Sequence, residues 1–224
     1  MDSLVIRTGD CTARAPRVVL LTGAYHANVD FVRAGFDQAL RDRALAAELI
    51  LVAPALENLR DRGWIERLRT QVMAPARTRA RGDLWLGGVS LGGFMALRYA
   101  LQRPEGIDGL CLLAPYLGSR IIAAEAARQL PEPLWQSQNL ADDDDERRVW
   151  RYARELGAGI ARHAVYCGLS SEDRFADTQG LLRALLGPER TQVIAGRHDW
   201  PAWRALWDNF LDRHLAGVAA ARPA

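Results

Sequence analysis

The chain has 224 residues, with 29 Lys+Arg against 27 Asp+Glu and a formal net charge of +2. This length fits one α/β domain over residues 1–224, and the balanced charge argues against nucleic acid or an anionic membrane surface as a partner. The three cysteines match no zinc pattern, and the sequence has neither a signal-peptide pattern nor the roughly 20 apolar residues of a membrane span, so we expect a cytoplasmic protein.

The first half of the chain alternates predicted strands with predicted helices. Strands of continuous apolarity are expected over 18–22 and 48–53, as in a parallel sheet that is covered on both faces. A short edge strand is expected over 4–7, before the first of them. Apolar residues at helical intervals predict helices over 29–46 and 60–79, which would cover that sheet.

The loop from Gly23 to Asn28 follows the first confident strand. It lies at the carboxyl end of that strand, where open α/β sheets bind their ligands. Its backbone is a candidate source of an oxyanion donor, with the Ala24 N–H favoured over the Tyr25 N–H. We expect His26, in the same loop, to face the substrate or the solvent rather than to act as a second catalytic base.

The central stretch of the chain contains the sequence Gly-Val-Ser-Leu-Gly at 88–92. An apolar strand over 84–88 precedes it, and an apolar helix follows until Pro104. A G-x-S-x-G motif in this strand–turn–helix context is typical of a nucleophilic serine, which is Ser90 here. The turn would also direct the Leu91 N–H, which has no partner within the helix, toward the same space as a first oxyanion donor.

Another apolar strand ends near Tyr116, and over 117–162 the sequence pattern differs from that of the preceding strands and helices. A predicted helix, a proline-rich break and a second helix suit a small helical cap inserted between two core strands. We expect Tyr116 to contact the substrate, and Trp135 either to line an acyl pocket or to pack the cap. The four aspartates over 142–145 are consecutive, unlike the alternating ligands of a calcium loop, so we expect a helix start and no metal.

The last third of the chain supplies two more strands, each followed by a polar turn. The strand at 163–168 leads to Asp173, and the strand at 191–195 leads to His198. Helices are expected from about 178 to 186 and from 201 to 215. We assign the aromatic stripe of the final helix to core packing.

Alternating strands and helices imply a mostly parallel sheet that is flanked by helices on both faces. The carboxyl ends of such strands share one edge, and Ser90, Asp173 and His198 each follow a strand end. A serine hydroxyl needs a base to take its proton, imidazole titrates in the useful range, and a carboxylate fixes the imidazole tautomer. The three residues therefore predict acyl transfer without a metal or an organic cofactor.

The chain resembles the α/β-hydrolase superfamily through the motif around Ser90, the acid turn and His198. The string from Gly196 to Trp203 is also similar to the region around the histidine in formylglutathione-hydrolase, enterochelin-esterase and mycolyltransferase-like esterases. The chain departs from many of these relatives at Thr22, where they have a histidine before the oxyanion glycine.

This resemblance implies that Ser90 is the nucleophile, His198 the base and Asp173 the acid. It also implies oxyanion donors from Leu91 and from the loop over 23–25. Glu172 and Asp177 are rival acids near Asp173, and the usual spacing after the strand favours Asp173.

We therefore expect a serine hydrolase that cleaves a carboxylic ester or thioester of a small substrate through an acyl-enzyme. Two alternatives stay open on the sequence. One is an acyltransferase with the same triad, and the other is a non-catalytic binding protein on a hydrolase scaffold.

Overall fold

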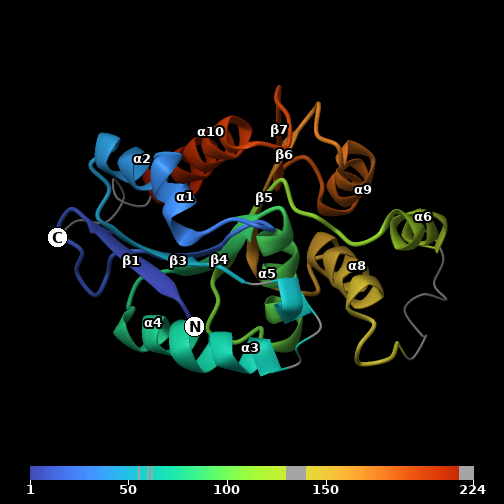
Figure 1. Ribbon diagram of the computed structural model, residues 1–224, viewed down its shortest axis with the longest axis horizontal. Coiled ribbons are helices and arrows are strands. Elements are labelled where there is room, and N and C mark those ends of the chain that lie inside the picture. The colour runs from blue at the N-terminus through green and yellow to red at the C-terminus, as the bar shows by residue number, and fades with distance from the viewer. Residues whose placement is uncertain (55, 60, 62, 130–139, 217–224) are drawn as a thin grey trace.

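The strands form one sheet through the middle of the molecule (Figure 1). The computed structural model describes residues 1–54, 56–59, 61, 63–129 and 140–216. Within these residues the sheet has seven strands in the order β1-β3-β2-β4-β5-β6-β7. The strands are β1 (Ser3–Thr8), β2 (Arg17–Leu21), β3 (Ala47–Val52), β4 (Leu84–Val89), β5 (Gly109–Leu113), β6 (Ala164–Ser170) and β7 (Thr191–Ile194). Only β1 among them runs antiparallel, so the predicted mostly parallel sheet is confirmed.

Helices cover both faces of the sheet, as the alternating pattern predicts. They are α1 (Asn28–Arg33), α2 (Phe36–Asp42), α3 (Gly63–Leu68), α4 (Ala74–Arg79), α5 (Leu91–Gln102), α6 (Arg120–Gln129), α8 (Asp145–Gly157), α9 (Ala176–Leu186) and α10 (Trp200–Phe210). One core cluster joins α1, α2 and α10 to the sheet, and the other joins α3, α4, α5, α6, α8 and α9 to it (Figure 1). The central strands β2, β4 and β5 are buried along their whole length.

Two of the predicted helices are broken, so the expected continuity was wrong. The helix expected over 29–46 divides at Gly35, whose φ of 78° lies in the left-handed region that glycine adopts easily. The helix expected over 60–79 divides into α3, a π turn over Arg69–Met73 and α4. Pro75 lies just after this π turn and has no N–H to donate, so the wider turn accommodates it without a regular helical bond.

The segment between β5 and β6 has two environments in its described part. Trp150 of α8 is fully buried in the core, and the partly exposed Asp145 at the start of α8 forms an ion pair with the buried Arg98 of α5 at 2.5 Å. The next helix, α6, lies to the outside of α8 (Figure 1); its Ala123 and Ala126 are buried in the same core cluster as Trp150, whereas its Ile121 is 78% exposed. The cap-like insertion expected over 117–162 stays a prediction.

The run of aspartates over 142–145 begins a helix. Asp144 accepts a hydrogen bond from the Arg147 N–H at 3.3 Å as the N-cap of α8, and Asp145 is engaged by Arg98. No group of side chains suited to a metal ion occurs among the described residues. None of the described helices has the length and apolarity needed to cross a membrane.

Candidate active site

Ser90 lies at the sharp turn between β4 and α5, where its backbone is strained. Its φ of 51° and ψ of −117° fall outside the regions that residues with a side chain ordinarily adopt. Neighbours hold this conformation, because the Ser90 N–H donates to the Leu113 carbonyl at 3.1 Å and the Ser90 carbonyl accepts from the Tyr116 N–H at 2.9 Å. The serine is therefore fixed by the end of β5 and by the loop that follows it.

Two glycines make this turn possible, as the motif predicts. A β-carbon on Gly88 would lie 2.4 Å from the Leu21 carbonyl oxygen, and one on Gly92 would lie 2.1 Å from the same atom. Both distances are far below any tolerated contact. The end of β2 therefore passes directly against the turn, and only glycine allows that approach.

The three residues that the sequence singled out lie in one hydrogen-bonded chain. The His198 Nε2 is 2.8 Å from the Ser90 Oγ, and the His198 Nδ1 is 2.7 Å from the Asp173 Oδ2. An ionised carboxylate can only accept, so the network assigns the proton to Nδ1 and leaves Nε2 to accept from the serine hydroxyl. This is the arrangement in which imidazole can take the serine proton.

Asp173 is the acidic residue of this hydrogen-bonded chain, and its carboxylate is fully buried. Burial by itself raises its pKa, but hydrogen bonds from His198, from the Phe175 N–H at 2.8 Å and from the Gln179 side chain at 3.0 Å outweigh burial and hold the pKa below its ordinary value. The neighbouring Glu172 is exposed and lies 3.8 Å from Arg197. The structure thus brings Asp173, and not Glu172, to the histidine.

Backbone hydrogen bonds join the acid turn to the loop that carries the histidine. The Ser171 N–H donates to the Ile194 carbonyl, and the Glu172 N–H donates to the Gly196 carbonyl, both at 2.9 Å. Asp199, the residue after the histidine, accepts from a backbone N–H of α10 as its N-cap. Asp173 and His198 are therefore held by linked turns.

Aromatic rings hold the imidazole of His198 from two directions. Phe175 and Trp203 each meet it edge-on, with ring centroids 5.0 Å away and interplanar angles of 85° and 87°. The sequence assigned the aromatic stripe of the final helix, which includes Trp203, to core packing; Trp203 is buried in the core and also contacts the His198 ring. Neither this contact nor the hydrogen bond from Gln179 had a signal in the sequence, because both depend on how α9 and α10 dock.

The loop after β2 lies beside Ser90, as expected of an oxyanion loop. A β-carbon on Gly23 would be 3.5 Å from the Ser90 Cβ. The Thr22 hydroxyl donates to the His26 carbonyl at 3.1 Å, and Tyr25 has a φ of 64° and is 91% exposed. The backbone amides of Ala24, Tyr25 and Leu91 stay predictions as oxyanion donors.

His26 and His198 both pack against the ring of Trp203. His26 contacts Trp203 edge-on at 5.7 Å between ring centroids, and its Nδ1 is 3.8 Å from an Asp30 carboxylate oxygen. Its side chain is only about one third exposed. Its predicted contact with substrate stays a prediction.

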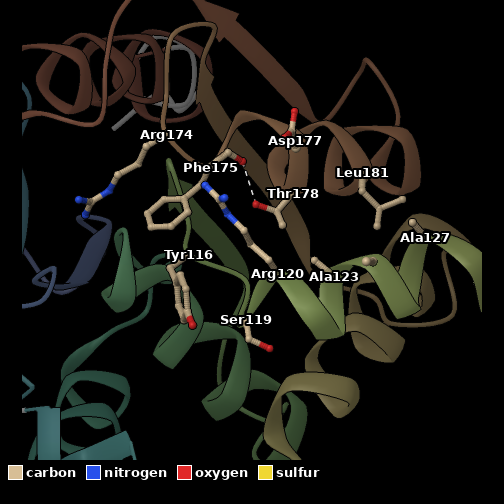
Figure 2. A pocket seen from close by; sticks show the side chains of 12 residues that line it. Tyr116, Ser119, Arg120, Ala123, Ala127, Arg174, Phe175, Asp177, Thr178 and Leu181 are labelled. Atoms are coloured by element: carbon tan, nitrogen blue, oxygen red, sulfur yellow. Dashed lines mark hydrogen bonds between the residues drawn. The ribbon is translucent and has the colours of Figure 1, made fainter.

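A pocket of about 480 Å³ lies between α6 and α9 (Figure 2). Tyr116 forms part of its wall together with Phe175, and their ring centroids are 5.5 Å apart. The expected role of Tyr116 at a substrate pocket is therefore compatible with its position. Trp135 lies outside the described residues.

The family model described as "Putative esterase" matches residues 58–213, which is more than half of the chain. The match includes the three hydrogen-bonded residues Ser90, Asp173 and His198. No curated protein sequence matches the chain.

Solved structures with the same fold cover nearly the whole chain. FphF, a fluorophosphonate-binding serine hydrolase of Staphylococcus aureus, is 11% identical, with a TM-score of 0.63 over 94% of this chain and 97% of that one. Est1E of Butyrivibrio proteoclasticus with ferulic acid bound is 12% identical, with a TM-score of 0.62 over 96% and 95%. An S-formylglutathione hydrolase from Agrobacterium tumefaciens is 17% identical, with a TM-score of 0.56 over 95% and 94%.

Proposed function

Since this chain belongs to the putative esterase family, we propose that it cleaves a carboxylic ester or thioester of a small substrate through an acyl-enzyme on Ser90. The observation that carries this proposal is the continuous chain of two short hydrogen bonds from Ser90 through His198 to Asp173. The fold shared with serine hydrolases supports it.

In the first half of the proposed reaction, the Ser90 Oγ attacks the carbonyl carbon of the ester. Its proton passes to the His198 Nε2, and the carbonyl oxygen becomes an oxyanion that the Leu91 N–H and an N–H of the loop over 23–25 would stabilise. The tetrahedral intermediate collapses when His198 gives its proton to the leaving alcohol or thiol. The acyl group then remains on Ser90.

In the second half, a water molecule takes the place of the leaving group. His198 removes its proton during attack on the acyl carbon, and returns that proton to the Ser90 Oγ as the acid product leaves. Asp173 stays ionised throughout, and its hydrogen bond to Nδ1 stabilises the positive charge that the imidazole carries between the two transfers. The reaction consumes one water for each ester.

The test compares Ser90→Ala with the wild type on a panel of p-nitrophenyl esters and acyl-CoA thioesters. We expect kcat to fall by up to about 10⁶-fold if the triad acts as a unit, with an unchanged circular dichroism spectrum. A fluorophosphonate probe should label the wild type and not the variant. Ser171→Ala is the matched control, because Ser171 is an exposed serine beside the acid turn.

Near-normal ester hydrolysis by Ser90→Ala would contradict the proposal. Product analysis in the presence of an added alcohol separates hydrolysis from acyl transfer by the same triad. Wild-type protein that neither cleaves any ester in the panel nor reacts with the probe would favour a non-catalytic binding protein.

A further inference from the structure

The pocket between α6 and α9 shares its inner wall with the triad. Tyr116, which lines it, donates its N–H to the Ser90 carbonyl at 2.9 Å, and Phe175, also in its wall, packs edge-on against the His198 ring. Two residues of the pocket wall therefore also contact Ser90 and His198, which places the pocket beside the candidate active site.

The body of the pocket is apolar. Its wall combines the rings of Tyr116 and Phe175 with small and aliphatic side chains from the two helices, namely Ala123, Ala124, Ala127 and Leu181. At about 480 Å³ it has the size of a small-ligand site. Such a wall suits a short hydrocarbon chain or one ring.

A cation with no partner among the described residues lies in the wall of this pocket. Arg120, the first residue of α6, is exposed, and Figure 2 shows its side chain extending toward Phe175 and Thr178. It forms no hydrogen bond or ion pair with any residue that the structure describes. In contrast, Arg147 on the neighbouring α8 is paired with Glu125 and Asp144.

The other charged groups around the pocket leave Arg120 available. Arg174 stacks its guanidinium over the Phe175 ring at 4.9 Å, and Figure 2 shows it pointing away from Arg120. Asp177 also lines the pocket, and its carboxylate points outward in the same view. The Glu146 carboxylate accepts hydrogen bonds from the Ser119 N–H and hydroxyl at 3.0 and 2.9 Å, so it is already engaged.

We propose that this pocket binds a carboxylate-bearing apolar substituent of the ester, with Arg120 as the residue that determines this specificity. A planar guanidinium can form two parallel hydrogen bonds with a carboxylate, and the hydrocarbon part of the substituent fills the apolar wall. This inference rests on the proposed ester hydrolysis at Ser90. The carboxylate belongs either to the acyl group or to the leaving alcohol, and the experiment has one arm for each.

The acyl arm compares p-nitrophenyl hemiglutarate with neutral p-nitrophenyl valerate, and the alcohol arm compares 4-acetoxybenzoate with neutral 4-acetoxybenzamide. In one arm we expect Arg120→Gln to lower the ratio of kcat/KM for the anionic over the neutral ester about tenfold, or about 1.4 kcal/mol. Arg128→Gln, which removes the same charge from the same helix outside the pocket, should leave this ratio unchanged. Equal ratios for wild type and Arg120→Gln in both arms, or equal losses in the two variants, would overturn the inference.

A binding measurement separates this inference from the proposed function. Calorimetry on Ser90→Ala with monoethyl glutarate and with 4-acetoxybenzoate should show affinity for at least one of them that falls about tenfold when Arg120→Gln is added. If the wild type cleaves neutral esters while binding is independent of Arg120, the inference alone fails. If the wild type cleaves no ester while binding still depends on Arg120, the proposed function fails and the anion site stands.

Discussion

Asp173 combines burial with ionisation, which is an unfavourable pair unless the surroundings compensate for it. Its carboxylate oxygens accept hydrogen bonds from the Phe175 N–H, from Gln179 and from His198. Two of these donors belong to its own turn and to the helix that follows. These two hydrogen bonds hold the Asp173 carboxylate in place independently of the histidine. His198 is therefore oriented by a group that is itself fixed.

Replacing this acceptor should disable the base while preserving its position. In Asp173→Asn the amide can present an N–H to the His198 Nδ1, which would favour the tautomer that carries its proton on Nε2 and cannot accept from Ser90. We expect kcat for ester hydrolysis to fall roughly 10³- to 10⁴-fold, with a smaller change in KM. Steady-state kinetics on one p-nitrophenyl ester measure this effect.

Glu172→Gln is the control, because it removes the adjacent exposed carboxylate instead. It should keep activity within about twofold. Loss of activity in Glu172→Gln with retention in Asp173→Asn would show that the structure pairs the histidine with the wrong acid.

At the scale of an element, the turn between β4 and α5 depends on the absence of side chains. We expect Gly92→Ala to lower the free energy of unfolding by roughly 1 to 3 kcal/mol and to reduce activity, because its β-carbon would overlap the carbonyl oxygen at the end of β2. The displaced turn would move the Ser90 hydroxyl away from His198. Urea denaturation and ester hydrolysis on the same preparation give both numbers.

Gly180→Ala is the matched control for this substitution. Gly180 lies within α9, and a β-carbon there would meet nothing within 4 Å. It should raise the free energy of unfolding by about 0.5 to 1 kcal/mol, since alanine is the better helix former. Equal effects at the two glycines would contradict the close approach of β2 to the turn.

The strands, and the meeting of Ser90, Asp173 and His198 in one hydrogen-bonded chain, could be predicted from the sequence because both depend on local pattern. Continuous apolar runs mark the buried strands, and the polar turns at their ends carry Asp173 and His198. The division of the helix at Gly35 was missed because one glycine does not by itself break an apolar periodicity. The contacts of Gln179 and Trp203 could not be predicted, because they arise from the docking of α9 and α10 around the site.

At the end of the sheet opposite the site, the buried Glu48 and Arg17 belong to a cluster of charges whose other members, Arg7 and Arg79, are partly exposed. Glu48, whose side chain is 1% exposed, bonds Arg7 at 2.8 Å and Arg79 at 3.1 Å and lies 3.5 Å from Arg17. Burial raises its pKa, but these arginines outweigh burial and hold the pKa below its ordinary value. One carboxylate therefore joins β1, β2, β3 and α4.

This cluster gives stability that depends on pH. Because the pKa of Glu48 is lowered by folding, its contribution is complete above the unfolded value of about 4.3 and is lost as pH falls through the folded value. Glu48→Gln should lower the free energy of unfolding at pH 7 by roughly 3 kcal/mol, since Arg17 stays buried without its counter-charge. The free energy of unfolding of this variant should also depend less on pH in the acid range than that of the wild type.

Urea denaturation between pH 3 and pH 7 measures both effects, and kcat of the folded variant at pH 7 should match the wild type because the cluster is remote from Ser90. An unchanged stability at pH 7 would show that the cluster is neutral overall. A large loss of kcat in the folded protein would contradict its separation from the site.

β7 is an edge strand of the sheet, so we expect the part of the site that follows β7 to unfold before the part that follows β4. Ser90 follows β4, which has a neighbour on each side, whereas His198 follows β7, a strand of four residues that pairs only with β6. Segments at a rim open first in sub-global fluctuations. Ester hydrolysis should therefore be lost at a lower urea concentration than the far-ultraviolet circular dichroism signal. In hydrogen exchange, the amides of β7 should take up deuterium well before those of β4. Coincident midpoints would mean that base and nucleophile share one cooperative unit.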